Sequence, residues 1–193
     1  QVLGEKVNLS QGRLVSSKSL AAAEKVGIDF ILLTGNPLTG VTNELILKAI
    51  KLAKKEFSGL IFAGKMHNAG IMNNDYLDLN ILKSFVVAGA DGILLPCVGT
   101  VPGILEEPEA KVVYKLQQMG ALMIGSIGTS QESATENVIS SLGLTNKRVG
   151  FDIQHIGDGG YGRIPLPENI MQLGLTLKGR RHTYFRMAQS PLR

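Results

Sequence analysis

The sequence has few of the residues that build cysteine-based or aromatic-based sites. It contains one cysteine and no tryptophan, and aromatic residues make up 5% of its 193 residues. One cysteine excludes a disulfide framework and a cysteine-rich zinc site, and scarce aromatics disfavour stacking on nucleic-acid bases. No apolar run approaches the ~18 residues that a membrane-spanning helix needs. We therefore expect a cytoplasmic protein that binds neither nucleic acid nor a membrane.

Glycine and, near the C-terminus, basic charge are what the sequence has in excess. It contains 23 glycines, which fall in short clusters, and its formal net charge is +4. Much of the positive charge lies in the last 15 residues, at Arg180, Arg181, Arg186 and Arg193. Because the remainder is nearly neutral, we expect no global polyanion-binding surface but allow a local anion site. We expect residues 179–193 to form a basic terminal helix facing solvent or a second subunit.

A unit of about 30 residues recurs along the chain. Each unit starts with a glycine-led apolar run, continues through a glycine-rich turn and then shows helical periodicity. The runs cover residues 27–33, 59–63, 89–95, 120–124 and 150–155, with a weaker run at 2–9. Short runs that are apolar throughout are typical of parallel strands buried on both faces.

The segments between these runs show the pattern of amphipathic helices. In residues 42–57, Ile46, Ile50 and Phe57 fall on one apolar stripe, and Thr42 is placed to cap the helix. Alternating strands and helices predict an α/β protein, either an open doubly wound sheet or a (β/α)8 barrel. The uniform unit length favours a single barrel domain over residues 1–193. Because a barrel usually has ~250 residues, we expect strands 3 to 8 here, with about two N-terminal strands missing.

Polar and glycine residues follow the predicted strands, and in a barrel all of them meet at one face. The turns 125–130 and 157–162 would follow strands 7 and 8, where barrels commonly hold phosphate. With a helix expected to begin near Gln131, the first turn would also lie at a positive helix end. Tight turns without a bound anion are the alternative explanation of these glycines. The expected substrate- or phosphate-binding residues are Asn36, Thr42, Asn68, Gly125, Ser126, Gly128, Thr129, Ser130, Gly157, Gly159 and Gly160.

Four residues at strand ends are candidates for catalysis: Lys65, His67, His155 and Asp158. Lys65 follows a buried strand, where a lysine can clamp an anion, stabilise negative charge or form a Schiff base. We favour the electrostatic role over the Schiff base, and a solvated lysine at the rim is the alternative. His155 suits general acid–base chemistry and Asp158 could orient it, although a structural histidine would also fit.

Other reactive residue types are expected to be structural. Asp91 and Asp152 lie near the starts of their strands, on the opposite face of the barrel, and Cys97 fits a small packed side chain. The spacing of histidines, cysteine and carboxylates matches no zinc motif. A magnesium ion held by Asp158 or Glu132 together with a ligand phosphate is left open. FMN at the two glycine-rich turns is a weaker alternative, so the cofactor stays unknown.

Several stretches together resemble a known family. They include Ala63-Gly-Lys-Met-His67 and Gly179-Arg-Arg-His-Thr-Tyr184, and the others lie at residues 33–37, 39–44, 95–96, 99–103, 127–132, 155–162 and 166–171. They are similar to a bacterial TIM-barrel family, a domain of unknown function whose members are often labelled haloacid dehalogenase-like hydrolases. The resemblance runs from about residue 8 to the C-terminus and implies a (β/α)8 barrel. A haloacid dehalogenase also needs an Asp nucleophile in a D-x-D-x-T/V motif, which this sequence lacks.

The sequence therefore favours an enzyme acting on a small phosphorylated or carboxylated metabolite. We expect lyase- or isomerase-like proton transfer next to a carbonyl at the C-terminal face of the barrel. Lys65 would stabilise negative charge, His155 with His67 would move the proton, and Asn36 and Thr42 would orient the substrate. The alternatives are a non-catalytic, metabolite-binding regulatory barrel and an FMN-dependent oxidoreductase. We expect a homo-oligomer.

Overall fold

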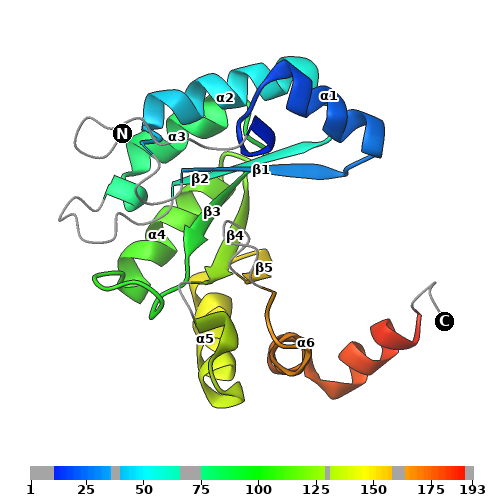
Figure 1. Cartoon of the computed structure of the whole chain (residues 1–193). Helices are drawn as coiled ribbons and strands as arrows, with labels where there is room; N and C mark the ends of the chain where they lie inside the picture. The colour runs from blue at the N-terminus through cyan, green and yellow to red at the C-terminus, as the bar shows by residue number, and fades with distance from the viewer. Residues whose placement is uncertain (1–10, 36–39, 66–74, 129–130, 158–163, 190–193) are drawn as a thin grey trace. The chain divides into compact units, whose positions relative to one another are not determined.

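Strands and helices alternate along the chain in the computed structural model, which describes residues 11–35, 40–65, 75–128, 131–157 and 164–189 (Figure 1). The strands are β1 (Phe30–Gly35), β2 (Leu60–Lys65), β3 (Gly92–Pro96), β4 (Leu122–Ile127) and β5 (Ile153–Ile156). The α-helices are α1 (Ser17–Val26), α2 (Asn43–Glu56), α3 (Leu79–Val87), α4 (Glu106–Gln117), α5 (Glu136–Val149) and α6 (Pro167–Ala188). Short 3-10 turns cover Gln11–Arg13, Asp75–Leu77 and Gln131–Ser133.

The five strands form one sheet in the order β1-β2-β3-β4-β5. Strand β1 runs parallel to β2 in a register that pairs Phe30 with Leu60, and β2 runs parallel to β3 with Phe62 opposite Gly92. Strands that follow one another without reversal match a barrel, whereas a doubly wound sheet reverses its strand order. The predicted α/β class is confirmed. The expected run at residues 2–9 lies outside the described residues, and closure into a barrel stays a prediction.

Four of the five glycines that were expected to open the strands instead follow the ends of the helices before them. Gly27 and Gly150 are the left-handed C-caps of α1 and α5, and Gly89 and Gly120 also have positive φ just after α3 and α4. Glycine takes this conformation without a steric penalty, which is why it follows helix ends. The period of about 30 residues is therefore real, but most strands begin two or three residues later than predicted.

Helix α2 forms as its sequence predicts. The Thr42 hydroxyl accepts a hydrogen bond from the backbone N–H of Leu45 at 3.3 Å, which caps the helix. Ile46, Ile50 and Ala53 are buried, and the helix packs against β1 and β2. The helix expected near Gln131 is wrong, because a 3-10 turn stands there and α5 begins only at Glu136.

The chain forms two compact units. The first contains Gln1–Leu95 and Lys111–Ile124, and the second contains Pro96–Ala110 and Gly125–Arg193. In the first unit, Phe62, Leu94 and Ile124 form an apolar cluster. In the second unit, Cys97, Ile127, Ile139, Leu142 and Leu173 pack between the sheet and helices α5 and α6. Because β4 begins in one unit and ends in the other, its carboxyl end belongs to the second unit.

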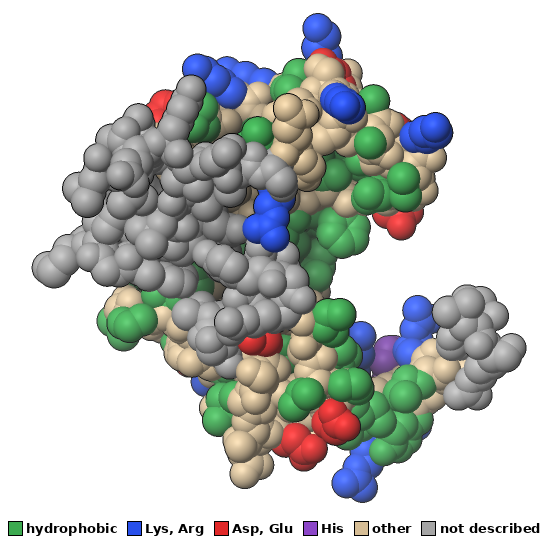
Figure 2. Space-filling model, viewed as in Figure 1, with side chains coloured by type: hydrophobic (Ala, Val, Ile, Leu, Met, Phe, Trp, Pro, Cys, Tyr) green, Lys and Arg blue, Asp and Glu red, His purple; other side chains and the backbone are tan. Residues whose placement is uncertain are grey.

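Helix α6 is interrupted at Gly179, whose φ of 75° and ψ of 164° are not helical. Beyond this break, Thr183 is buried and donates a hydrogen bond from its hydroxyl to the carbonyl of Gly174 at 2.9 Å. Arg180, Arg181 and Arg186 are exposed. Figure 2 shows basic side chains near the C-terminal end of the described chain. Helical structure thus continues on both sides of Gly179, up to Ala188.

Candidate functional site

Ser126 and His155 meet at the carboxyl ends of two neighbouring strands in the second unit. Ser126 lies in β4 and His155 in β5, and the distance between Ser126 Oγ and His155 Nδ1 is 2.8 Å. The backbone N–H of Gly157 donates to the carbonyl of Ile127 at 3.0 Å, which joins the two strands just beyond this pair. Sequence reasoning selected both residues for two separate turns, and the structure makes them direct hydrogen-bond partners.

Strand alternation explains why Ser126 can reach His155. Its neighbour Ile127 is fully buried in the apolar cluster against α5 and α6. A Cβ atom on Gly125 would come within 2.7 Å of Asn146 Nδ2 and of the Phe151 ring. These contacts place Gly125 on the side of the sheet that α5 covers. The absence of a side chain at Gly125 is therefore explained by packing.

Two glycines lie beside the Ser126–His155 pair. A Cβ atom on Gly128 would lie 3.1 Å from the carbonyl oxygen of Gly157 and 3.7 Å from Ser126 Oγ, so the two turns approach closely. Gly157 has a φ of 139°, which side-chain-bearing residues rarely adopt. The turns after β4 and β5 thus come together around a polar pair.

The turn after β4 is braced by helix α6. The Asn169 side chain is 2% exposed, and its Nδ2 donates to the carbonyls of Glu132 and Ala134 at 3.0 and 2.8 Å. The Gln131 backbone N–H donates to the carbonyl of Gly128 at 3.1 Å. These bonds fix the backbone just after Gly128. Glu132, which was considered as a magnesium ligand, is buried in this turn.

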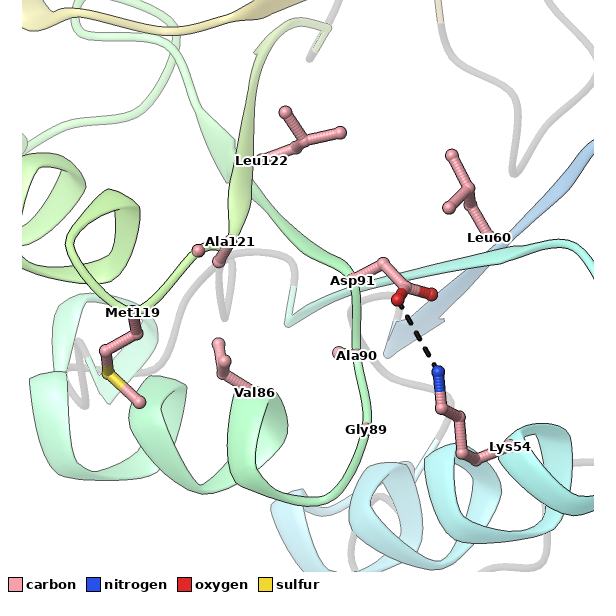
Figure 3. Close-up of a pocket in the computed structure, with 10 residues that line it drawn as sticks. Lys54, Leu60, Val86, Gly89, Ala90, Asp91, Met119, Ala121 and Leu122 are labelled. Carbon is pink, nitrogen blue, oxygen red and sulfur yellow. Dashed lines mark ion pairs between the residues drawn. The ribbon is translucent and has the colours of Figure 1, made fainter.

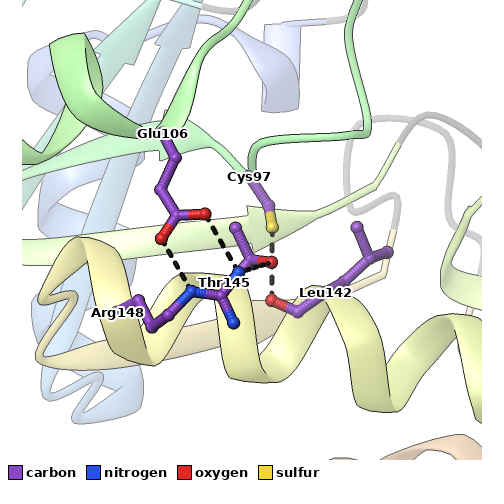
Figure 4. A network of polar contacts seen from close by, with 5 residues as sticks. All are labelled: Cys97, Glu106, Leu142, Thr145 and Arg148. Carbon is purple, nitrogen blue, oxygen red and sulfur yellow. Dashed lines mark hydrogen bonds and ion pairs between the residues drawn. The ribbon is translucent and has the colours of Figure 1, made fainter.

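A second polar cluster of the second unit lies around the end of β3. Cys97 is fully buried, and its Sγ lies 3.6 Å from the carbonyl oxygen of Leu142 (Figure 4). The Cys97 backbone N–H donates to the carbonyl of Ser126. Burial, and secondarily the carboxyl of Glu109, raises the pKa of the Cys97 thiol to about 12. The thiol is therefore protonated at neutral pH and is no nucleophile. The packed role predicted for Cys97 agrees with this burial.

Glu109 in α4 is also fully buried, and burial raises the pKa of its carboxyl to about 8 although the backbone N–H of Val98 opposes the shift. At neutral pH this carboxyl is mostly protonated. Glu106, one turn earlier, accepts hydrogen bonds from Arg148 Nε and Nη2 at 2.7 and 2.9 Å (Figure 4). These bonds lower the pKa of Glu106, and they tie the start of α4 to the end of α5.

The remaining predicted site residues are not gathered by the described part of the structure. Lys65 ends β2 in the first unit, opposite Gly35 of β1, and its side chain is outside the description. The Thr42 hydroxyl caps α2, so capping explains this residue without a substrate. Eight predicted residues lie outside the described residues: Asn36, His67, Asn68, Thr129, Ser130, Asp158, Gly159 and Gly160.

An open pocket of about 430 Å³ lies in the first unit, at the amino ends of β2, β3 and β4 (Figure 3). Asp91 there pairs with Lys54 at 3.5 Å and accepts a hydrogen bond from the backbone N–H of Ile61 at 2.8 Å. These contacts hold the start of β3 to β2 and to α2, in agreement with the structural role predicted for Asp91. Within this unit, the pocket lies at the amino end of β2, whereas Lys65 lies at the carboxyl end of the same strand.

Within the described ranges, no three His, Cys, Asp or Glu side chains are grouped so that they could hold a metal ion. The helices of those same ranges include none that is both long and apolar enough to cross a membrane.

Several buried polar residues near the site were missed by sequence reasoning. Glu109 lies on the helical stripe that also carries the buried Val113 and Leu116, and Asn146 lies on the stripe with Ile139 and Leu142. A polar residue at an apolar position of a helical pattern is the signal that could have found them. Asn146 Nδ2 donates to Gln154 Oε1 at 2.6 Å, next to His155 on β5.

Comparison with solved structures shows what this fold resembles. "QR15, an Aldolase" is 15% identical, with a TM-score of 0.63 over 86% of this chain and 72% of that chain. A 3-hexulose-6-phosphate synthase is 17% identical, with a TM-score of 0.54 over the same shares. A tetrameric deoxyribose phosphate aldolase from Aeropyrum pernix is 16% identical, with a TM-score of 0.50 over 86% of this chain and 76% of that one. At these identities the likeness shows the fold alone.

Comparison by sequence gives the family. No curated protein matches the chain, so the hydrolase label and the bacterial origin implied by the resemblance stay predictions. One family model matches residues 1–193 in full. The chain belongs to the family described as Domain of unknown function (DUF7916).

Proposed function

We propose that this protein is a lyase or isomerase that acts on a small phosphorylated or carboxylated metabolite at the carboxyl ends of β4 and β5. The observation that carries the proposal is the 2.8 Å hydrogen bond between Ser126 and His155, beside two close glycine turns. In parallel α/β folds, ligands bind at the carboxyl ends of the strands. A histidine there, with a fixed hydrogen bond on one ring nitrogen, is suited to act on a substrate oxygen or proton.

The glycine turns would hold the anionic group of the substrate. Because Gly128 and Gly157 carry no side chain, a ligand can approach the backbone of these turns closely. The helix dipole adds little to this site, since α5 begins only at Glu136. Among the described residues we assign the His155 ring as the main donor to the anion, since the Gly157 backbone N–H already donates to the carbonyl of Ile127.

Lys65 would stabilise the negative charge that develops when a bond next to a carbonyl breaks or a proton leaves. Lys65 is the last residue of β2, at the carboxyl end of that strand. His67 would assist in proton transfer. An electrostatic role for Lys65 is preferred to a Schiff base, and borohydride trapping with a carbonyl substrate separates the two, because only a Schiff base is reduced to a stable adduct.

The solved structures of the same fold support this reaction class. Two of the three described above are aldolases and the third is a synthase, and two carry the name of a sugar phosphate. Lyase chemistry next to a carbonyl on a phosphorylated substrate agrees with the polar pair and the glycine turns. From the same comparison we infer a (β/α)8 barrel and a homo-oligomer, the latter because one neighbour is a tetramer. We place the protein in the cytoplasm.

The test is turnover of a panel of sugar phosphates, phosphoenolpyruvate and keto acids, each with and without Mg²⁺. We expect cleavage or isomerisation of at least one phosphorylated compound, and its loss in His155→Ala. His182→Ala is the matched control, because His182 is an exposed histidine of α6 and its replacement should leave turnover unchanged.

Two other outcomes would overturn the proposal, and a third would add a metal ion to it. If a compound binds but is not turned over, and His155→Ala does not weaken its binding, the protein is a metabolite-binding regulatory protein instead. A yellow purified protein with a flavin absorption spectrum would indicate an FMN-dependent oxidoreductase. Dependence on Mg²⁺ would assign a metal role to residues beyond those described.

A further inference from the structure

The partners of the Ser126 hydroxyl limit where the proton of the His155 ring can lie. Ser126 is 3% exposed, so water does not satisfy its hydroxyl. Among the described residues, His155 Nδ1 is the one partner that Ser126 Oγ contacts within hydrogen-bond distance. Two arrangements of hydrogen atoms are compatible with this contact. Either the hydroxyl donates to an unprotonated Nδ1, or a protonated Nδ1 donates to the hydroxyl oxygen.

Only the first arrangement gives the hydrogen of the Ser126 hydroxyl an acceptor. If Nδ1–H donated to Ser126, the buried O–H would be left without an acceptor among these residues. An unmade hydrogen bond of a buried hydroxyl biases an equilibrium by about tenfold or more. The serine therefore selects the neutral ring in which Nδ1 accepts and Nε2 carries the hydrogen.

We propose that Ser126 is a positioning residue that holds His155 in the Nε2–H form, so that His155 serves the site as a hydrogen-bond donor to a substrate oxygen. The substrate class that follows is a carbonyl or carboxylate compound whose oxygen gains negative charge during the reaction. This inference rests on the proposed function for its substrate, but the ring form itself does not depend on any ligand.

A neutral imidazole that donates from Nε2 has a defined chemical role. It polarises a carbonyl and stabilises the oxygen anion that forms when the neighbouring bond changes. It does not accept a proton at Nε2, since that nitrogen already carries one. A proton removed from the substrate must therefore go to a group other than His155 Nε2.

The decisive experiment measures the two ring nitrogens of His155 by nitrogen-15 NMR in the ligand-free protein. The chain has three histidines, so spectra of His67→Asn and His182→Asn assign the His155 signals by elimination. We expect a neutral ring with its hydrogen on Nε2 in the wild type. In Ser126→Ala, we expect the share of the Nδ1–H form to rise by about tenfold, and in Ser126→Thr, which keeps a hydroxyl, the wild-type form to persist.

A wild-type His155 with its hydrogen on Nδ1, or an unchanged ring in Ser126→Ala, would overturn the inference. Turnover gives the second readout. If His155 acts as a donor, His155→Gln should keep at least about ten times more activity than His155→Ala, because the glutamine amide still donates. Equal loss in both variants would overturn the donor role. Absence of turnover in a wild type that shows the Nε2–H form would instead overturn the proposed function and leave the role of Ser126 intact.

Discussion

Glu109 gives the most quantitative prediction, because its carboxyl is fully buried and its pKa is raised by burial to about 8 from the usual 4.5. Between these pH values, the folded chain keeps a proton on Glu109 that the unfolded chain has released. The free energy of unfolding therefore falls as the pH rises through this window, by up to about 1.4 kcal/mol per pH unit. This stabilising contribution is complete below about pH 4.5 and is lost above about pH 8.

Glu109→Gln removes the titrating group and keeps its shape. The fixed cost of burying an amide is the same at every pH, so it cancels when the variant and the wild type are compared across pH. Between pH 5 and pH 8, the unfolding free energy of the variant should rise relative to the wild type by about 4 kcal/mol, which is the slope applied to 3 pH units.

Urea unfolding followed by circular dichroism at pH 5, 6, 7 and 8 measures this difference. Glu106→Gln is the matched control on the same helix. Hydrogen bonds from Arg148 lower the pKa of Glu106, so Glu106 is ionised in both the folded and unfolded states over this range. The difference in unfolding free energy between Glu106→Gln and the wild type should therefore not change with pH. If the difference in unfolding free energy between Glu109→Gln and the wild type is also independent of pH, the claim that the buried Glu109 carboxyl of α4 is neutral is refuted.

Three further predictions concern single residues. Cys97 should react with a disulfide reagent only as the chain unfolds, because its thiol is buried with a raised pKa; rapid labelling of the native protein at pH 8 would contradict this. Gly125→Ala should lower the unfolding free energy by roughly 1–3 kcal/mol, since the new Cβ would crowd Asn146 and Phe151, and an unchanged urea midpoint would contradict the packing role. Lys65→Met should reduce turnover by about a hundredfold or more at an unchanged thermal midpoint; full activity would remove Lys65 from the mechanism.

The sequence pattern predicted the alternation of strands and helices because each signal is local. Apolar runs of five to seven residues marked all five described strands, and the stripe through Ile46 and Ile50 marked α2. The strand starts were misplaced because a glycine before an apolar run can open the strand or close the preceding helix. Only the backbone angles distinguish the two, and they assign Gly27 and Gly150 to helix ends.

The candidate site was predicted in part. Ser126 and His155 were selected because both follow buried strands that the barrel prediction makes neighbours. Their contact depends also on the register between β4 and β5, which the sequence does not specify. The expected helix at Gln131 was wrong because a 3-10 turn has the same local composition. Glu109 and Asn146 were overlooked because the search for function was confined to strand ends, whereas these residues lie on buried helix stripes.

The measurement that tests the central claim most directly is thermal unfolding of the protein with inorganic phosphate, sugar phosphates and keto acids, compared with Gly157→Ala. A ligand at about 100 times its dissociation constant adds about 2.7 kcal/mol, which should raise the midpoint by roughly 5 to 10 °C. We predict such a rise for at least one phosphorylated compound, and its loss in Gly157→Ala, where a side chain would strain the turn beside His155. If no phosphorylated compound raises the wild-type midpoint, the two glycine turns bind no phosphate. The proposal of a phosphorylated substrate is then contradicted.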